Sequence, residues 1–290
     1  MAAAGASPRL TTGVILGLLF GISCSVSAPE LPRPGTCDPF QLTAVSPAPD
    51  SEGIPPDVVP TLTFSDFPNP DTVDGSTVLL FTGFFYHTGR YWVDLVGRRA
   101  YFRPSGPLTL GLGYTLAVRP GIRSLRGCAL QRDIPPAIPS GGDALAVRFR
   151  VVAPGAARLP VPVPASATTY AQVVGIFAAH CAGGACHLTA AEAPPEPGGC
   201  TTAPAGGLSL CERDARQALL GVPSRQVSRL VLVTPGDSSR SYLLRKIIGA
   251  PPVVGHVGVP DDSLSQEDER AIEDWIDRGA LPTQTNDGGL

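Results

Sequence analysis

Charged residues are scarce in this chain of 290 residues, and residue types that mark several common protein classes are nearly missing. Charged residues make up 16% of the sequence and the net charge is −3, which excludes a broad basic surface for nucleic acid. Lysine and methionine each occur once, as Lys246 and Met1. With only four histidines, no Gly-x-Ser-x-Gly sequence and no glycine-rich loop before Lys-Ser or Lys-Thr, the chain lacks the signatures of hydrolases and nucleotide-binding enzymes.

Long apolar runs are also missing, apart from a short one near the N-terminus. Residues 13–22 are apolar and follow Arg9, but a run of this length is too short for a membrane-spanning helix. The pattern predicts an export signal over residues 1–24. Ser23-Cys24 resembles a lipoprotein processing site, so we expect Cys24 to be lipidated and to hold the protein at a membrane. Cleavage after Val26-Ser27-Ala28 by an ordinary signal peptidase is the alternative.

Glycine and proline are abundant, with 33 and 32 residues, and this favours short strands and many turns. Between residues 41 and 152 the sequence predicts strands at 61–64, 77–81, 91–95, 99–103, 114–118 and 144–151. Apolar residues alternate in the last two, which is typical of strands with one buried face. Short strands at regular spacing indicate an all-β sandwich. The turn and strand motifs in this segment resemble bacterial Ig-like domains, which implies a scaffold and no particular activity.

The most informative motif is Cys181-Ala182-Gly183-Gly184-Ala185-Cys186-His187. Two cysteines followed directly by a histidine are typical of covalent haem attachment, in which the thiols bind the haem and the histidine ligates its iron. The usual spacing has two residues between the cysteines, and here there are four. A structural disulfide between Cys181 and Cys186 is the main alternative, and zinc is disfavoured because a fourth ligand is hard to find.

Helices are predicted on both sides of this motif. Apolar residues between 170 and 177 recur at helical spacing, and Ser265 with Asp268 predicts a capping box for a last helix that carries Trp275. These segments, the cysteine motif and Leu220-Gly221-Val222-Pro223-Ser224 resemble, in order and spacing, the cytochrome c-like domains of secreted myxobacterial and planctomycete proteins. The resemblance implies a mainly α-helical domain over residues 167–282 that binds haem c through Cys181, Cys186 and His187.

The chain departs from that family at the second iron ligand. The resemblance places a methionine near Val259, but Met1 is the only methionine in the sequence. His256 lies three residues before Val259 and is the candidate substitute, so the predicted metal ligands are His187 and His256.

The remaining cysteines are expected to form disulfides, because exported proteins meet an oxidising environment. With Cys24 assigned to lipid and two cysteines to haem, Cys37, Cys128, Cys200 and Cys211 remain of the seven. We expect the pairs Cys37–Cys128 and Cys200–Cys211, although four cysteines allow three pairings.

The sequence thus predicts a multidomain chain with two folded parts. An N-terminal linker covers residues 25–40, the Ig-like β-sandwich 41–152, a proline-rich linker 153–166, the cytochrome c-like domain 167–282 and a disordered tail 283–290. The two parts are expected to fold separately, with few contacts between them.

The functional hypothesis is electron transfer or redox sensing at the cell envelope, as a periplasmic or outer-membrane lipoprotein. The chain is expected to be an electron carrier more than an enzyme, and no catalytic residue is predicted. Its redox partner is not identified by the sequence. The alternative from another functional class is a haem-free envelope scaffold or adhesion protein.

Overall fold

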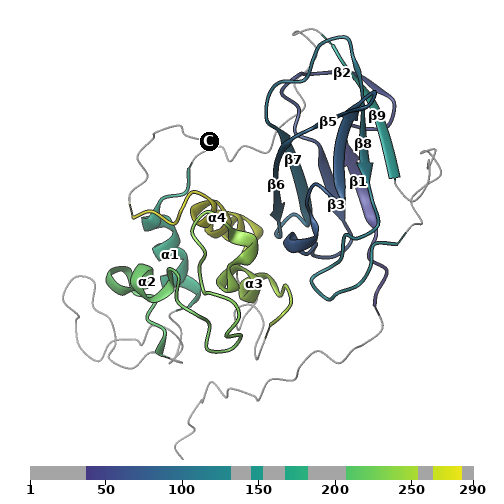
Figure 1. Cartoon of the computed structure of the whole chain (residues 1–290). Coiled ribbons are helices and arrows are strands. Elements are labelled where there is room, and N and C mark those ends of the chain that lie inside the picture. The colour runs from purple at the N-terminus through teal and green to yellow at the C-terminus, as the bar shows by residue number, and fades with distance from the viewer. Residues whose placement is uncertain (1–36, 132–144, 153–166, 182–206, 254–263, 283–290) are drawn as a thin grey trace, which may run out of the picture.

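The computed structural model describes residues 37–131, 145–152, 167–181, 207–253 and 264–282. These residues form a β-sandwich followed by a helical region that lies beside it (Figure 1). The export signal, residues 25–36 of the linker predicted over 25–40, the linker at 153–166 and the tail lie outside the described residues. The last residues of the predicted N-terminal linker are part of the sandwich, since Phe40 is buried in its core.

The sandwich consists of two sheets. The first has the strand order β1-β3-β7-β6 and the second β2-β9-β8-β4-β5. All neighbours are antiparallel except β2 and β9. In chain order the strands are β1 (Leu42–Ser46), β2 (Ser51–Ile54), β3 (Thr61–Phe64), β4 (Val78–Thr82), β5 (Phe85–His87), β6 (Gly89–Asp94), β7 (Arg99–Pro104), β8 (Gly113–Val118) and β9 (Leu145–Val151), with the short 3-10 helix η1 (Pro70–Thr72) before β4.

Apolar residues alternate along β8 and β9, as predicted, and form part of the core. Tyr114, Leu116 and Val118 of β8 are buried, as are Val147 and Phe149 of β9. Because neighbouring side chains point to opposite faces of a strand, this alternation directs one apolar row toward the other sheet. The sequence therefore predicted these central strands correctly, whereas β1, β2 and β5 were not predicted.

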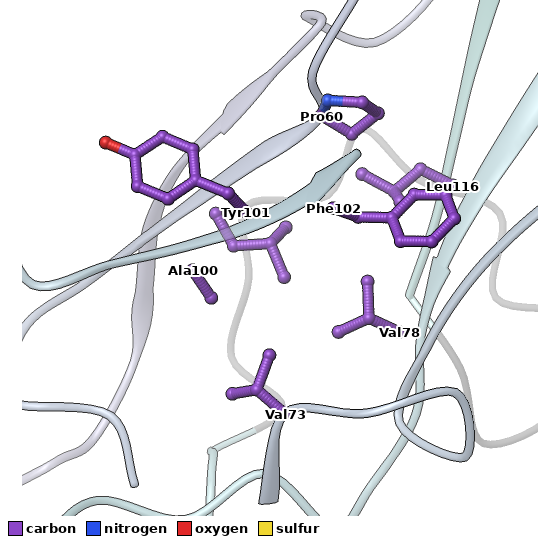
Figure 2. A pocket seen from close by; sticks show the side chains of 8 residues that line it. Pro60, Val73, Val78, Ala100, Tyr101, Phe102 and Leu116 are labelled. Atoms are coloured by element: carbon purple, nitrogen blue, oxygen red, sulfur yellow. The ribbon is translucent and has the colours of Figure 1, made fainter. Parts of the chain in front are cut away.

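The space between the sheets is filled by apolar side chains. Figure 2 shows a small gap lined by residues of both sheets, including Val78, Phe102 and Leu116. The gap does not admit a water molecule, as is usual in a close-packed interior. It is part of the core and not a ligand site.

A disulfide joins Cys37 to Cys128, as predicted, with the Cα atoms 5.5 Å apart. Beside it Phe40 and Leu130 form a parallel bridge, and the N–H of Gln131 donates to the carbonyl of Phe40 at 2.8 Å. The disulfide thus fixes the start of the sandwich to the segment after β8.

The helical region contains four α-helices and a 3-10 helix among the described residues. They are α1 (Tyr170–His180), α2 (Glu212–Leu219), η3 (Ser238–Arg240), α3 (Tyr242–Ile248) and α4 (Gln266–Asp277). The predicted capping box of Ser265 and Asp268 begins α4, and Thr169 with Gln172 forms a second one at α1. These caps satisfy backbone N–H groups that have no partner within the helix. None of the described helices is both long and apolar enough to cross a membrane.

Helices α1 and α4 pack against each other in the core of this region. The rings of Tyr170 and Trp275 stack with their centroids 5.8 Å apart. Val173, Phe177 and Ile276 are also fully buried. Both helices therefore present the apolar faces that the sequence predicted, although a cytochrome c-like fold for this region remains a proposal.

A small set of contacts joins the two parts. Arg240 of η3 forms an ion pair with Asp71 of η1, and Arg270 of α4 forms one with Asp94 of β6, at 2.7 and 2.8 Å. Ala250 belongs to the apolar core of the sandwich, and Ile248 packs against both cores. The prolines of residues 153–166 predicted a linker, but a linker sequence carries no information about which surfaces of the two parts meet.

Candidate functional site

Cys181 is the described member of the predicted haem-attachment motif. It is the C-cap residue of α1, and its N–H donates to the carbonyl of Phe177 at 2.8 Å. Its side chain is half-buried and packs against the apolar core of the helical region. Cys186, His187 and His256 lie outside the described residues, so the structure does not test whether the four residues meet.

The position of Cys181 follows from how α1 is held at its N-terminal end. The capping box fixes the first turn, and the hydroxyl of Tyr170 donates to the carbonyl of Glu212 at 2.7 Å. Phe177, one turn before Cys181, is completely buried. The hydrogen bond holds α1 against α2, and the stack of Tyr170 on Trp275 holds it against α4. Cys181 thereby lies at the margin of the core.

An open hollow of about 390 Å³ lies beside this helix end, between α1 and α4. Polar side chains line much of it, and the imidazole Nε2 of His180 lies 4.0 Å from a carboxylate oxygen of Asp268. Gln172, His180, Glu267 and Asp268 line it beside small and apolar residues, so the hollow is mixed in character. Haem requires mostly apolar walls. Half-buried apolar residues pack, like Cys181, on the edge of the helical core and could supply such walls; they are Val174, Ile176, Leu208, Leu220, Leu232 and Ile247.

The other predicted site residues are only partly described. Cys211, at the N-cap of α2, is disulfide-bonded. Its expected partner Cys200 lies outside the described residues, as does Cys24, so that pairing and lipidation stay predictions. Across the described ranges, no group of three or more His, Cys, Asp or Glu side chains is placed to hold a metal ion.

A buried charge cluster at the junction of the two parts was missed by the sequence reasoning. One guanidinium nitrogen of Arg270 lies 2.8 Å from a carboxylate oxygen of Asp94 and 2.8 Å from one of Glu273. Glu273 is 5% exposed, and its second oxygen has no hydrogen-bond partner. Burial, together with the negative charge of Asp94, raises the pKa of Glu273 well above its ordinary value, while Arg270 opposes the shift. The sequence signal was an acid on the apolar face of α4, next to Ile272.

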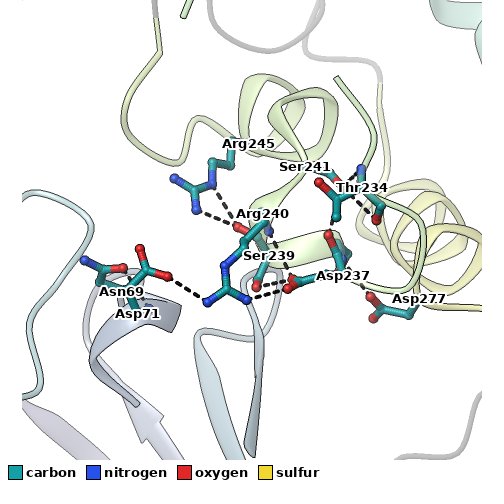
Figure 3. A network of polar contacts seen from close by, with 10 residues as sticks. Asn69, Asp71, Thr234, Asp237, Ser239, Arg240, Ser241, Arg245 and Asp277 are labelled. Carbon is teal, nitrogen blue, oxygen red and sulfur yellow. Dashed lines mark hydrogen bonds and ion pairs between the residues drawn. The ribbon is translucent and has the colours of Figure 1, made fainter. Parts of the chain in front are cut away.

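A second polar network joins η3 to η1. Figure 3 shows Arg240 between Asp71 and Asp237, with nitrogen–oxygen distances of 2.7 and 2.6 Å. Nearby, Nε and an Nη of Arg245 donate to the carbonyl of Ser239 at 2.9 and 2.6 Å. Burial lowers the pKa of Arg245 to about 10, so this guanidinium still carries its charge at neutral pH. The network positions the helical region and contains no arrangement typical of catalysis.

Comparison with known proteins identifies the N-terminal part. Residues 37–135 match the bacterial Ig-like domain family. No curated protein matches the chain.

Solved structures resemble the chain at low identity. The S-layer protein rSbsC is 14% identical with a TM-score of 0.29, over 43% of this chain and 14% of that one. PcoC, a methionine-rich copper resistance protein from Escherichia coli, is 16% identical with a TM-score of 0.28, over 39% and 99%. CopC from Methylosinus trichosporium OB3b is 14% identical with a TM-score of 0.29, over 39% and 93%. The chain thus spans about a seventh of the S-layer structure.

The bacterial Ig-like domain and the Cys37–Cys128 disulfide are features of an extracytoplasmic protein. Disulfides persist in oxidising compartments and are rare in the bacterial cytosol. Both features therefore place the protein outside the cytoplasm.

Proposed function

We propose that this chain is an exported c-type cytochrome-like protein that transfers electrons at the cell envelope. The observation that carries the proposal is the place of Cys181: it ends a helix that is fixed against α4, with its sulfur half-buried at the edge of an apolar core. Cys181 and Cys186 would hold haem c through thioether bonds, with His187 and His256 as iron ligands. When bound, haem supplies reversible one-electron chemistry.

The described residues would serve this function by shielding and positioning. Half-buried apolar side chains pack, like Cys181, on the edge of the helical core, so a flat apolar group could cover some of them and remove further surface from water. The capping box of α1 and the Tyr170–Trp275 stack would keep the cysteine at a fixed distance from that surface. The lack of methionine beyond Met1 implies a lower reduction potential than that of His/Met cytochromes.

Expression in a periplasm that contains the haem-attachment machinery tests the proposal. We expect a Soret band that survives denaturation and is lost when both Cys181 and Cys186 are replaced by alanine. His187→Ala and His256→Ala should shift the spectrum toward high spin. His180→Ala, which removes a histidine directly beside the motif, is the matched control and should leave the spectrum unchanged. A protein that matures without a Soret band would contradict the proposal.

A haem-free envelope scaffold is the second candidate, with Cys181–Cys186 as a disulfide. The bacterial Ig-like domain and the ion pairs between the two parts favour it, since a rigid module suits a spacer or adhesion role. Peptide mapping under non-reducing conditions distinguishes the two: a Cys181–Cys186 disulfide in protein from the same haem-competent periplasm supports the scaffold.

We further propose that the protein is held at the membrane by a lipid on Cys24. The apolar segment before Cys24 and the extracytoplasmic features of the folded part support this placement. Cys24→Ser should prevent lipid incorporation and release the protein into the soluble periplasmic fraction. Unchanged membrane association of that variant would instead favour another mode of attachment.

A further inference from the structure

Exposed apolar residues gather at one end of the sandwich. Phe84, Phe85 and Tyr86, at the turn of the β4–β5 hairpin, are 98%, 76% and 63% exposed. Leu110 and Leu112, just before β8, are 45% and 42% exposed. Among the large apolar residues that the structure describes, Leu281 is the sole exposed one elsewhere. Such a concentration marks an interaction site more often than a neutral surface.

The strand pairing brings these two segments together. Thr82, the last residue of β4, donates its hydroxyl to the carbonyl of Gly113 at 2.7 Å, where β8 begins. The hairpin turn therefore lies next to Leu112. We call Phe84, Phe85, Tyr86, Leu110 and Leu112 the apolar end of the sandwich.

This apolar end points away from the helical region. Strand β4 begins at Val78, shortly after η1, where Asp71 pairs with Arg240. It ends at the hairpin that carries Phe84. The helical region adjoins the η1 end of the sandwich, as Figure 1 shows, so it does not cover the apolar end.

Arginines predominate in the strands next to the apolar end. Arg90 follows Tyr86 by four residues, lies opposite Arg103 in the β6–β7 register, and both side chains are exposed. Asp94 is the only carboxylate between residues 75 and 132, and it is engaged by Arg270 at the other end of β6. Arginine binds phosphate groups through charge-assisted hydrogen bonds. Arg150 lies opposite Gly113, and Glu52 is the carboxylate beside it, 3.9 Å from its Nε. Arginines therefore outnumber carboxylates around these segments.

We propose that the apolar end inserts into the surface of a membrane that contains anionic lipids. Phe84 protrudes from a hairpin turn and touches almost nothing in the folded chain, a shape that suits a wedge between lipids better than a flat interface with a second protein. Tyrosine at such a tip can place its ring among acyl chains and its hydroxyl among headgroups. Arg90 and Arg103 contact lipid phosphates. This inference does not depend on whether haem is bound.

Tryptophan fluorescence of the full chain tests the proposal. In Phe84→Trp, vesicles that contain phosphatidylglycerol should shift the emission to the blue, and brominated lipids should quench it. Vesicles of phosphatidylcholine alone should have a weaker effect. Leu281→Trp is the matched control, because it places the probe on an exposed apolar site elsewhere, and it should not be quenched. The signal of the native tryptophans, measured on the wild type, is subtracted.

Further substitutions separate the contributions. In the Phe84→Trp background, Arg90→Gln and Arg103→Gln should each weaken insertion on anionic vesicles about fivefold, since one arginine near such a surface contributes about that factor. Phe85→Ser should weaken it by about tenfold or more on any vesicle. All of these residues are exposed, and thermal unfolding is expected to stay unchanged.

Two results would overturn the proposal. One is equal quenching of Phe84→Trp and Leu281→Trp, which would mean that the tip does not enter the bilayer. The other is a protein that dimerises with rising concentration, loses this dimerisation in Phe84→Ser, and shows no vesicle-dependent quenching in Phe84→Trp. That result would assign the apolar end to contact with a second copy of the chain.

Discussion

Glu273 shows how one residue can make the stability of this protein depend on pH. Its carboxyl group is buried beside Asp94, with one oxygen on Arg270 and the other without a partner. Two carboxylates share one guanidinium, so a proton on Glu273 removes a like-charge repulsion and lets this carboxyl group donate a hydrogen bond to Asp94. The raised pKa of Glu273 expresses this preference of the folded chain for the protonated form.

We predict that the free energy of unfolding falls as the pH rises above the ordinary glutamate pKa of 4.5. In that range the unfolded chain has released the proton that the folded chain still holds, so this contribution is fully present below pH 4.5 and is lost as pH rises through the folded-state pKa. One such proton corresponds to a slope of up to about 1.4 kcal/mol per pH unit. Glu273→Gln should flatten the slope above pH 6 and stabilise the chain at neutral pH. Below pH 6 a slope should remain, because burial raises the pKa of Asp277 to about 6.

Denaturant unfolding between pH 4.5 and 8 measures the effect. Glu267→Gln, on the exposed side of α4, is the matched control and should leave the wild-type slope in place. If Glu273→Gln destabilises the chain equally at every pH, the carboxyl group acts as a charged partner of Arg270 and the explanation fails.

Among the helices, the packing of α1 against α4 holds the helical region together. Trp275 is fully buried, stacks on Tyr170, and donates its indole N–H to the carbonyl of Leu281 at 3.1 Å. The same pair fixes the helix that ends at Cys181. Loss of this contact should therefore affect both stability and the proposed site.

We predict that Trp275→Ala lowers the free energy of unfolding by about 3 to 5 kcal/mol, because it leaves a cavity between α1 and α4. Tyr170→Phe keeps the stacked ring but loses the hydrogen bond to Glu212, and should cost about 1 kcal/mol. Leu281→Ala, at a half-exposed position in the same region, should cost less than either. Chemical denaturation of the three variants gives the comparison, and equal losses in Trp275→Ala and Leu281→Ala would show that the pair does not hold the region together.

For the whole molecule, the junction between the two parts decides how it unfolds. Ile248 contributes to both apolar cores, and two arginines of the helical region pair with acids of the sandwich. An isolated helical region would expose Ile248 and leave Arg240 and Arg270 without those acids. The two parts are therefore coupled, although each has its own core.

We predict that the full chain unfolds in one calorimetric transition, and that residues 165–290 alone melt at a lower temperature than the full chain. Ile248→Ala should lower the melting of both parts together, since it removes contacts to both cores. Val174→Ala is the matched control: it truncates another half-buried residue, which contacts the helical core alone, and should not weaken the sandwich. Two separate transitions in the wild type would contradict the coupling.

Features with a local or compositional cause could be predicted from the sequence. Alternation placed Leu116 and Val147 in the sandwich core, because side chains of a strand point to opposite faces. Ser265 and Asp268 marked the start of α4, because a cap acts within one turn. Export and cysteine content predicted the Cys37–Cys128 disulfide, since an oxidising compartment favours paired thiols. Strands β1, β2 and β5 carry weak local patterns, and the sequence missed them.

Contacts between distant surfaces could not be predicted from the sequence. Arg270 lies far from Asp94 in the sequence, and the residues around each of them do not predict their ion pair. Phe84 and Leu112 become neighbours because β4 pairs with β8, and Ile248 enters two cores because α3 ends at the junction. Such contacts depend on how whole elements pack, while propensity, capping and alternation act over a few residues. The tertiary structure therefore determined the buried pH-sensitive acid, the coupling of the two parts and the apolar end of the sandwich.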